Sequence, residues 1–248
     1  MTELVHYAAA DAVATITLDS PHNRNALSRQ LVSELFAHLR TAAADDAVRV
    51  VLIASAGKVF CSGADLSEAT ADGMEEGAKQ IVELQRLIVS MDKPVVVRAF
   101  GAVRAGGIGI VAAADIAVAN ESATFALTEV KLGLAAAIIS LTVHHRMDPR
   151  AAALTTLGGE VFGGVDAAAY GLVTLAVPDA DLDERVAVVC RSLATGAPQG
   201  LRESKRILNA DLLARIDARG AEMASLSARL FASDEAREAM TAFLARKK

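Results

Sequence analysis

Two glycine-containing turns are the segments of this chain whose residue types could do chemistry. They cover residues 60–66 and 101–109. Each follows an apolar run that predicts a strand, and each precedes a segment that predicts a helix. Small residues let the backbone approach a ligand closely, and the first turn of a helix offers free N–H groups and a partial positive charge. Two such turns that meet at one point would bind an oxygen atom on which negative charge develops.

Other interpretations of these segments stay open. Each turn taken alone is better explained as an ordinary connection. A dinucleotide-binding loop would need a third glycine after Gly107 and Gly109, where the chain has Ala112. His144 and His145 are adjacent, so in regular secondary structure they point apart and do not form the two-ligand site of an i, i+4 pair. We expect no metal site, and no order of Ser, His and Asp with a nucleophile turn is visible.

The elements that must position these turns predict an α/β fold. Short apolar, β-branched runs predict strands over residues 12–18, 48–54, 95–99 and 116–119. Ser28 can cap a helix with an i, i+4 apolar stripe, and further helices are expected to end near Met91, to cover residues 108–114 and to follow Asp183. Strands that alternate with helices favour mostly parallel pairing.

Composition and charge exclude several classes of protein. With 248 residues, of which 53% are hydrophobic and 22% charged, the chain predicts one compact domain with a helical C-terminal extension. A net charge of −5 with dispersed basic residues argues against nucleic acid as a partner. The sequence has no long apolar run and no basic leader, so we expect a cytoplasmic protein with no membrane partner. Cys61 and Cys190 form no disulfide framework.

Five motifs in order resemble those of the crotonase (enoyl-CoA hydratase/isomerase) superfamily, and together they span nearly the whole chain. They occupy residues 24–27, 60–66, 101–115, 125–133 and 166–173. The resemblance implies a crotonase-type α/β spiral of repeated ββα units in residues 1–190. It implies a helical region in residues 191–248 that covers CoA and forms trimers. The implied partner is an acyl-CoA thioester, the implied assembly a homotrimer or dimer of trimers, and no cofactor is expected, since coenzyme A is part of the substrate.

The resemblance also implies roles for particular residues. The backbone N–H groups of an oxyanion hole fall on Ser62 and Gly106, and the catalytic carboxylate falls on Glu129. Further residues expected to contact the substrate or CoA are Arg24, Ala26, Ala64, Asp65, Leu66 and Gly107. Lys205 and Arg206 form a basic pair that could also contact CoA, although such a pair on an exposed helix is more often a solvated surface.

One of the two carboxylates that a hydratase of this family uses is absent from the sequence. Family hydratases use two carboxylates because one group activates water while another manages the proton at Cα. The first of these falls at Gly109, which has no side chain. Moving a double bond from β,γ to α,β needs only one base, so the residues favour isomerase-like chemistry. Glu68 could replace the missing carboxylate and Arg104 could bind an acidic substrate tail, but both are more simply explained as surface residues.

Three functions therefore stay open. The favoured one is an enzyme of fatty acid metabolism, either an isomerase or a hydratase (a lyase), that forms an enolate from an unsaturated acyl-CoA. The second is another reaction of the family, such as decarboxylation or thioester hydrolysis. The third is a non-catalytic acyl-CoA-binding homologue. The length and branching of the acyl chain are not readable from the sequence.

Overall fold

Two β-sheets form the centre of the molecule. The computed structural model describes residues 2–68 and 71–245, and of residues 66, 71–74 and 243–245 it describes only the backbone. The strands of this part are β1 (Val5–Ala10), β2 (Val13–Leu18), β3 (Val50–Ser55), β4 (Val59–Cys61), β5 (Val95–Ala99), β6 (Ala102–Arg104), β7 (Ile116–Asn120), β8 (Thr124–Ala126), β9 (Phe162–Gly163) and β10 (Leu175–Val177). One sheet has the order β1-β2-β3-β5-β7-β10 and the other the order β4-β6-β8-β9.

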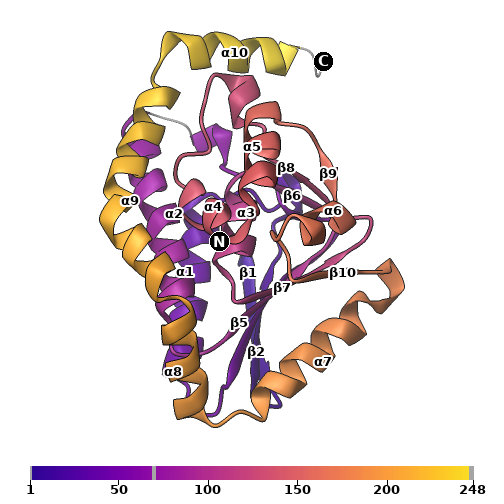
Figure 1. Ribbon diagram of the computed structural model, residues 1–248. Helices are drawn as coiled ribbons and strands as arrows, with labels where there is room; N and C mark the ends of the chain where they lie inside the picture. The colour runs from indigo at the N-terminus through magenta and orange to yellow at the C-terminus, as the bar shows by residue number, and fades with distance from the viewer. Residues whose placement is uncertain (1, 69–70, 246–248) are drawn as a thin grey trace.

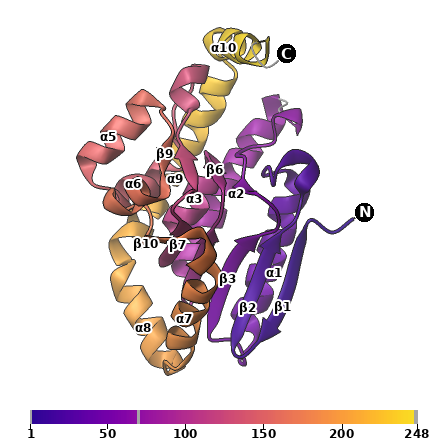
Figure 2. The ribbon, with the colours of Figure 1, turned by 90° about the vertical axis from the view of Figure 1, so that its right-hand side faces the viewer.

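Helices cover both sheets (Figures 1 and 2). They are α1 (Arg29–Ala44), α2 (Ala71–Ser90), α3 (Gly106–Ala113), α4 (Ser140–Arg146), α5 (Pro149–Gly158), α6 (Gly164–Ala169), α7 (Leu182–Ala194), α8 (Pro198–Leu208), α9 (Ala210–Phe231) and α10 (Asp234–Ala245), with short 3-10 turns η1 (Pro21–Asn23), η2 (Leu66–Glu68), η3 (Glu129–Leu132) and η4 (Asp179–Asp181). None of the described helices has the length and apolar character that crossing a membrane requires.

The strands come in pairs that are followed by helices, which confirms the expected ββα repeats. The pairs β3/β4, β5/β6 and β7/β8 each place the first strand in the larger sheet and the second in the smaller one. Neighbouring strands of successive pairs run parallel, because each ββα unit returns the chain to the same end of the sheets. The sequence predicted the first strand of each pair and missed the second, since a three-residue strand has no measurable periodicity.

Apolar side chains cover both faces of the larger sheet. The main core lies on one face, and α1 contributes its predicted i, i+4 stripe of Leu31, Leu35 and Leu39. Ser28 caps α1 as expected, because its side chain accepts the Leu31 N–H at 3.3 Å. On the other face α7 packs on β3, β5 and β7 and buries Cys190. Residue 190, the expected end of the core region, therefore lies within α7.

The C-terminal helices pack on the body along one side (Figure 1). The helix α9 lies against α2, and a Cβ at Gly220 would approach Val82 Cγ1 to 2.7 Å, so the two helix backbones come close. The helix α10 crosses one end of the molecule and packs on η3. These contacts tie the end of the chain to elements formed much earlier in the sequence.

A buried ion pair anchors α8. Lys205 is 5% exposed, and its ammonium lies 2.8 Å from Asp115 Oδ2 and donates to the carbonyl oxygen atoms of Ile88 and Lys93 at 2.8 and 2.9 Å. Asn209 donates to the other Asp115 oxygen at 2.8 Å. The suggestion that Lys205 contacts CoA is therefore wrong, because every donor of this ammonium has an acceptor inside the protein.

We expect Lys205→Met to lower the free energy of unfolding by about 3–5 kcal/mol, because it leaves the Asp115 carboxylate without its cation. Arg206→Met is the matched control, since among the described residues Arg206 pairs only with Glu203, on the surface, and its loss should cost under about 1 kcal/mol. Urea unfolding of both variants measures the difference. Equal losses would contradict the assignment of Lys205 as the anchor.

Candidate active site

Three parallel strand ends bring the candidate residues together. In the smaller sheet β4 pairs with β6 and β6 pairs with β8, all parallel. The first glycine turn continues beyond the end of β4, and the second continues beyond the end of β6. Glu129 comes three residues after Ala126, the last residue of β8. Because the carboxyl ends of neighbouring parallel strands share one edge, both turns and Glu129 emerge on the same side of the sheet.

The two glycine turns pack directly against each other at Gly63 and Gly107. A Cβ atom at Gly63, whose φ is +97°, would lie 3.0 Å from Ala105 Cβ, and one at Gly107 would lie 2.6 Å from Cys61 Cβ. Real Cβ atoms do not come this close to such neighbours, so only glycine permits the contact. From the sequence, small residues are expected to allow a ligand to approach closely. In the structure they allow the other turn to approach.

The first turn has a free donor that differs from the expected Ser62 N–H. The Ser62 N–H donates to the Arg24 carbonyl oxygen at 3.1 Å, so it is already occupied. The Leu27 N–H donates to the Gly63 carbonyl oxygen at 2.8 Å, which makes Ala64 the bridge partner of Leu27. In a parallel bridge of this kind the N–H of the partner residue points away from the bridge. The Ala64 N–H has no acceptor within residues 2–68 and 71–245.

The second turn presents the N–H of Gly106, the first residue of α3. The N–H groups of Ile108 and Gly109 donate back to the Ala105 carbonyl oxygen at 2.8 and 3.3 Å, whereas that of Gly106 has no acceptor in the described part of the chain. A Cβ at Gly106 would lie 2.6 Å from Leu27 Cδ1. Since Leu27 also pairs with Ala64, the free N–H groups of the two turns lie on neighbouring segments.

Glu129 opens η3 in a half-buried position. The Leu134 N–H donates to the Glu129 carbonyl oxygen at 3.0 Å, and Gly133 ends η3 with a φ of +68° beside Ala236 of α10. One carboxylate oxygen, Oε2, is buried and has no hydrogen-bond partner among the described residues. This burial raises the pKa of the Glu129 carboxyl above its ordinary value, although the residue's own backbone N–H lowers it in part.

An aliphatic side chain fills the space beside Gly109. A Cβ at Gly109 would lie 2.6 Å from Ile139 Cγ2 and 3.4 Å from Gln85 Oε1. Ile139 is 1% exposed, and Gln85 is held by the Thr142 hydroxyl at 2.7 Å. A glutamate at position 109 would therefore require Ile139 to move. Sequence reasoning missed Ile139, because no motif links it to Gly109.

Asp65 in the first turn and Glu68 just after it both accept hydrogen bonds from other residues of the protein. The Glu68 carboxylate accepts the Arg29 N–H at 2.9 Å and pairs with the Arg29 guanidinium at 3.4 Å. The Asp65 carboxylate accepts hydrogen bonds from Ser67 and from Asn23, and the Ser67 hydroxyl is the main reason that the pKa of this carboxyl is lowered. Both carboxylates hold the turn in place, so Glu68 is not free to replace the missing carboxylate.

The remaining predicted residues lie around this centre. Arg24 is exposed and Ala26 is 5% exposed, while of Leu66 only the backbone is described. Arg104 donates to the carbonyl oxygen and hydroxyl of Thr124 at 2.5 and 3.0 Å, so it ties β6 to β8. Within the described residues no group of three or more His, Cys, Asp or Glu side chains could hold a metal ion.

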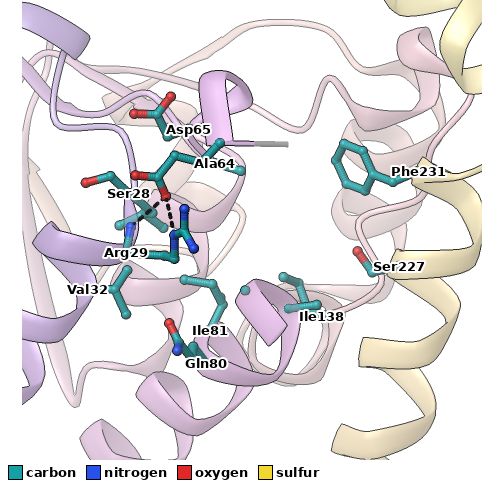
Figure 3. A pocket seen from close by; sticks show the side chains of 14 residues that line it. Ser28, Arg29, Val32, Ala64, Asp65, Gln80, Ile81, Ile138, Ser227 and Phe231 are labelled. Carbon is teal, nitrogen blue, oxygen red and sulfur yellow. Dashed lines mark hydrogen bonds and ion pairs between the residues drawn. The ribbon is translucent and has the colours of Figure 1, made fainter. Parts of the chain in front are cut away.

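A pocket with a volume of about 90 Å³ opens to solvent beside the first turn. Its apolar lining includes Leu27, Val32, Ala78, Ile81, Ile138 and Phe231. Figure 3 shows Phe231 and Ser227 of α9 facing Ala64 and Arg29 across this space. An apolar pocket that opens beside a free backbone N–H can take a hydrocarbon chain whose polar end reaches that N–H.

Comparisons with known proteins agree on one family. The model of the family described as enoyl-CoA hydratase/isomerase matches residues 8–248. A putative enoyl-CoA hydratase of Thermus thermophilus is 34% identical over 79% of this chain and 80% of its own length. A probable enoyl-CoA hydratase of Rhodobacter capsulatus is 31% identical over 97% of this chain and 94% of its own. The crystal structure of a putative enoyl-CoA hydratase from Mycobacterium avium paratuberculosis is similar, with a TM-score of 0.94, 48% identity and coverage of 98% and 97%.

We expect Gly109→Ala to lower the free energy of unfolding by about 1–3 kcal/mol, because the new methyl group overlaps Ile139. Gly77→Ala is the matched control: Gly77 also lies in a helix, but a Cβ there meets nothing within 4 Å. That control should be neutral or up to about 1 kcal/mol more stable. Thermal or urea unfolding compares the two, and a neutral Gly109→Ala would show that the space beside Gly109 is open.

Proposed function

The chain belongs to the enoyl-CoA hydratase/isomerase family, and on this premise we propose that it forms an enolate from an unsaturated acyl-CoA by isomerase-like chemistry with a single carboxylate. The observation that carries the proposal is the Glu129 carboxylate, whose buried Oε2 has no hydrogen-bond partner among the described residues, together with the aliphatic side chain beside Gly109. The reaction needs no cofactor, because coenzyme A belongs to the substrate.

The proposed oxyanion hole consists of the Ala64 and Gly106 N–H groups. Both lack an acceptor among the described residues, and both adjoin Leu27. A thioester carbonyl oxygen between them would receive two hydrogen bonds that strengthen as negative charge develops. Loss of one such donor typically costs about 10²–10³ in rate. The neighbouring apolar pocket would hold part of the acyl chain or of the pantetheine arm.

The proposed reaction moves a double bond from β,γ to α,β. The Glu129 carboxylate takes a proton from Cα, and the electron pair of the broken C–H bond passes to the thioester oxygen to give a dienolate. The protonated Glu129 then returns the proton to Cγ, and the electrons flow back to form the conjugated double bond. No water is consumed, and Glu129 ends as a carboxylate. Its raised pKa suits both steps, because it makes the carboxylate a stronger base than an exposed one.

Hydration is the second candidate, and the names of the relatives favour it. The Thermus thermophilus and Rhodobacter capsulatus proteins are both described as enoyl-CoA hydratases. Hydration by this chain would need a second group to activate water. Ile139 stands beside the position where the family has that carboxylate, and Glu68 is paired with Arg29. We therefore rank isomerisation above hydration.

We also propose that the chain assembles as a homotrimer or a dimer of trimers. Large apolar side chains stay exposed on α5, on α6 and on the segment between them: Leu154 is 65% exposed, Leu157 75%, Val161 60% and Val165 58%. Neighbouring exposed apolar residues of this kind are characteristic of surfaces that bind another protein chain. Light scattering of the purified protein, with a chain mass of 25.7 kDa, measures the assembly.

An assay with two substrates tests the proposed reaction. We expect conversion of a 3-enoyl-CoA to its 2-trans isomer, with hydration of the 2-trans-enoyl-CoA slower by about 10² or more because one catalytic group is missing. Absorbance of the conjugated thioester follows both reactions. Rapid water addition would contradict the single-carboxylate mechanism. CoA binding without either reaction would indicate a non-catalytic homologue.

We expect Glu129→Gln to lower kcat by about 10²–10⁴, because it removes the base. The same change should stabilise the protein at neutral pH by about 1 kcal/mol, since an ionised carboxylate with a raised pKa opposes folding above that pKa. In the wild type, kcat/KM should fall as the pH drops through the raised pKa, so the acid limb should lie above pH 4.5, the ordinary value for a glutamate. Retained turnover would show that Glu129 is not the base.

A further inference from the structure

The sulfur atom of Cys61 lies at the point where the two glycine turns meet. Cys61 is the last residue of β4 and is fully buried. Its Sγ accepts the N–H of Gly63 in the first turn at 3.4 Å. Gly107, in the first turn of α3, packs on the same sulfur, since a Cβ atom at Gly107 would lie only 3.1 Å from it. One side chain thus contacts both turns.

Packing holds the sulfur in this place. A Cβ at Gly107 would lie 2.6 Å from Cys61 Cβ and 3.1 Å from its Sγ, so the start of α3 rests directly on the cysteine side chain. Gly63 in turn lies against Ala105, the residue before α3. A shorter side chain at position 61 would leave a gap at the point where the two turns meet.

The two glycine residues that Cys61 contacts are sequence neighbours of the two free donors. Gly63 precedes Ala64, and Gly107 follows Gly106. Only the φ and ψ of one residue separate neighbouring N–H groups, so a displacement of Gly63 or Gly107 also displaces the free donor beside it. Ala105 adds to this constraint, since it is a non-glycine residue held at φ +44° and ψ −117°, a conformation that such residues rarely adopt.

Cys61 is unsuited to act as a nucleophile or base. Burial raises the pKa of its thiol to about 12, although the Gly63 and Gly107 N–H groups oppose this change in part. The thiol stays protonated at neutral pH, and solvent does not reach it. Its position at the contact of the turns therefore needs an explanation other than reactivity.

We propose that Cys61 is a positioning residue whose sulfur joins the two turns and fixes the direction of the Ala64 and Gly106 N–H groups. The inference rests on the oxyanion hole of the proposed function and deepens it: one side chain holds in place the residue beside each free donor. A shift of either donor by a fraction of an ångström would weaken its bond to the developing oxyanion far more than its contact with the neutral substrate.

The test compares Cys61→Ala and Cys61→Ser with Cys190→Ala. Cys190 is a matched control because it is also buried, at 4% exposure, but packs in the separate core under α7. Each variant is assayed for turnover of a 3-enoyl-CoA and for its stability. The polarisation of a bound carbonyl is read from the red shift in absorption of para-dimethylaminocinnamoyl-CoA, a chromophoric thioester whose spectrum responds to hydrogen bonds at its oxygen.

We expect Cys61→Ala to lower kcat by about 10-fold or more, with KM changed less than about threefold, and to reduce the red shift. Cys61→Ser keeps an acceptor atom and should recover part of the lost kcat and part of the lost red shift. Cys190→Ala should lose stability but keep the wild-type red shift and kcat. A folded Cys61→Ala protein with wild-type kcat and red shift would overturn the proposal.

Two further outcomes are decisive. If Cys61→Ala does not fold, Cys61→Ser decides. The serine side chain is shorter and cannot reach both turns. A wild-type red shift and kcat in Cys61→Ser would therefore overturn the proposal. A wild-type protein that neither isomerises 3-enoyl-CoA nor shifts the probe would contradict the proposed function itself, and the inference with it. A wild-type shift with no dependence on Cys61 would contradict the inference alone.

Discussion

The backbone contact between two glycine turns is the constraint on which the candidate site depends. Gly63 and Gly107 lack the Cβ atoms that would separate the turns, so β4 and β6 can deliver their following residues to one place. The remainder of the smaller sheet then adds Glu129 at the same edge, through β8. Larger residues at either glycine would keep the turns apart, and the free N–H groups would no longer face a common space.

Burial of Glu129 has opposite consequences for stability and for chemistry. A carboxylate without a partner costs free energy when it is buried, and its pKa rises for that reason. The same rise makes the carboxylate a more effective proton acceptor near neutral pH. Beside Gly109 no charge has to be buried, because the apolar side chain of Ile139 fills the space.

The C-terminal helices show how charged residues can serve packing rather than binding. Lys205 reaches through the interior to Asp115, so the buried ion pair connects α8 to the link between α3 and β7. Arg104 likewise links β6 to β8. In both places backbone carbonyl oxygen atoms accept the donors of the cation, which is what allows a charged side chain to leave water.

The sequence by itself determined the α/β alternation, the positions of both turns, the cap at Ser28 and the absence of an acid at Gly109, because these follow from local spacing and residue type. Only the tertiary structure decided which N–H groups are free. The Ser62 N–H donates to the carbonyl oxygen of Arg24, which is far away in sequence. The Ala64 N–H has no acceptor among the described residues. Lys205 looked like a surface residue for the same reason: burial and hydrogen-bond partners depend on contacts between distant segments, which no local pattern records.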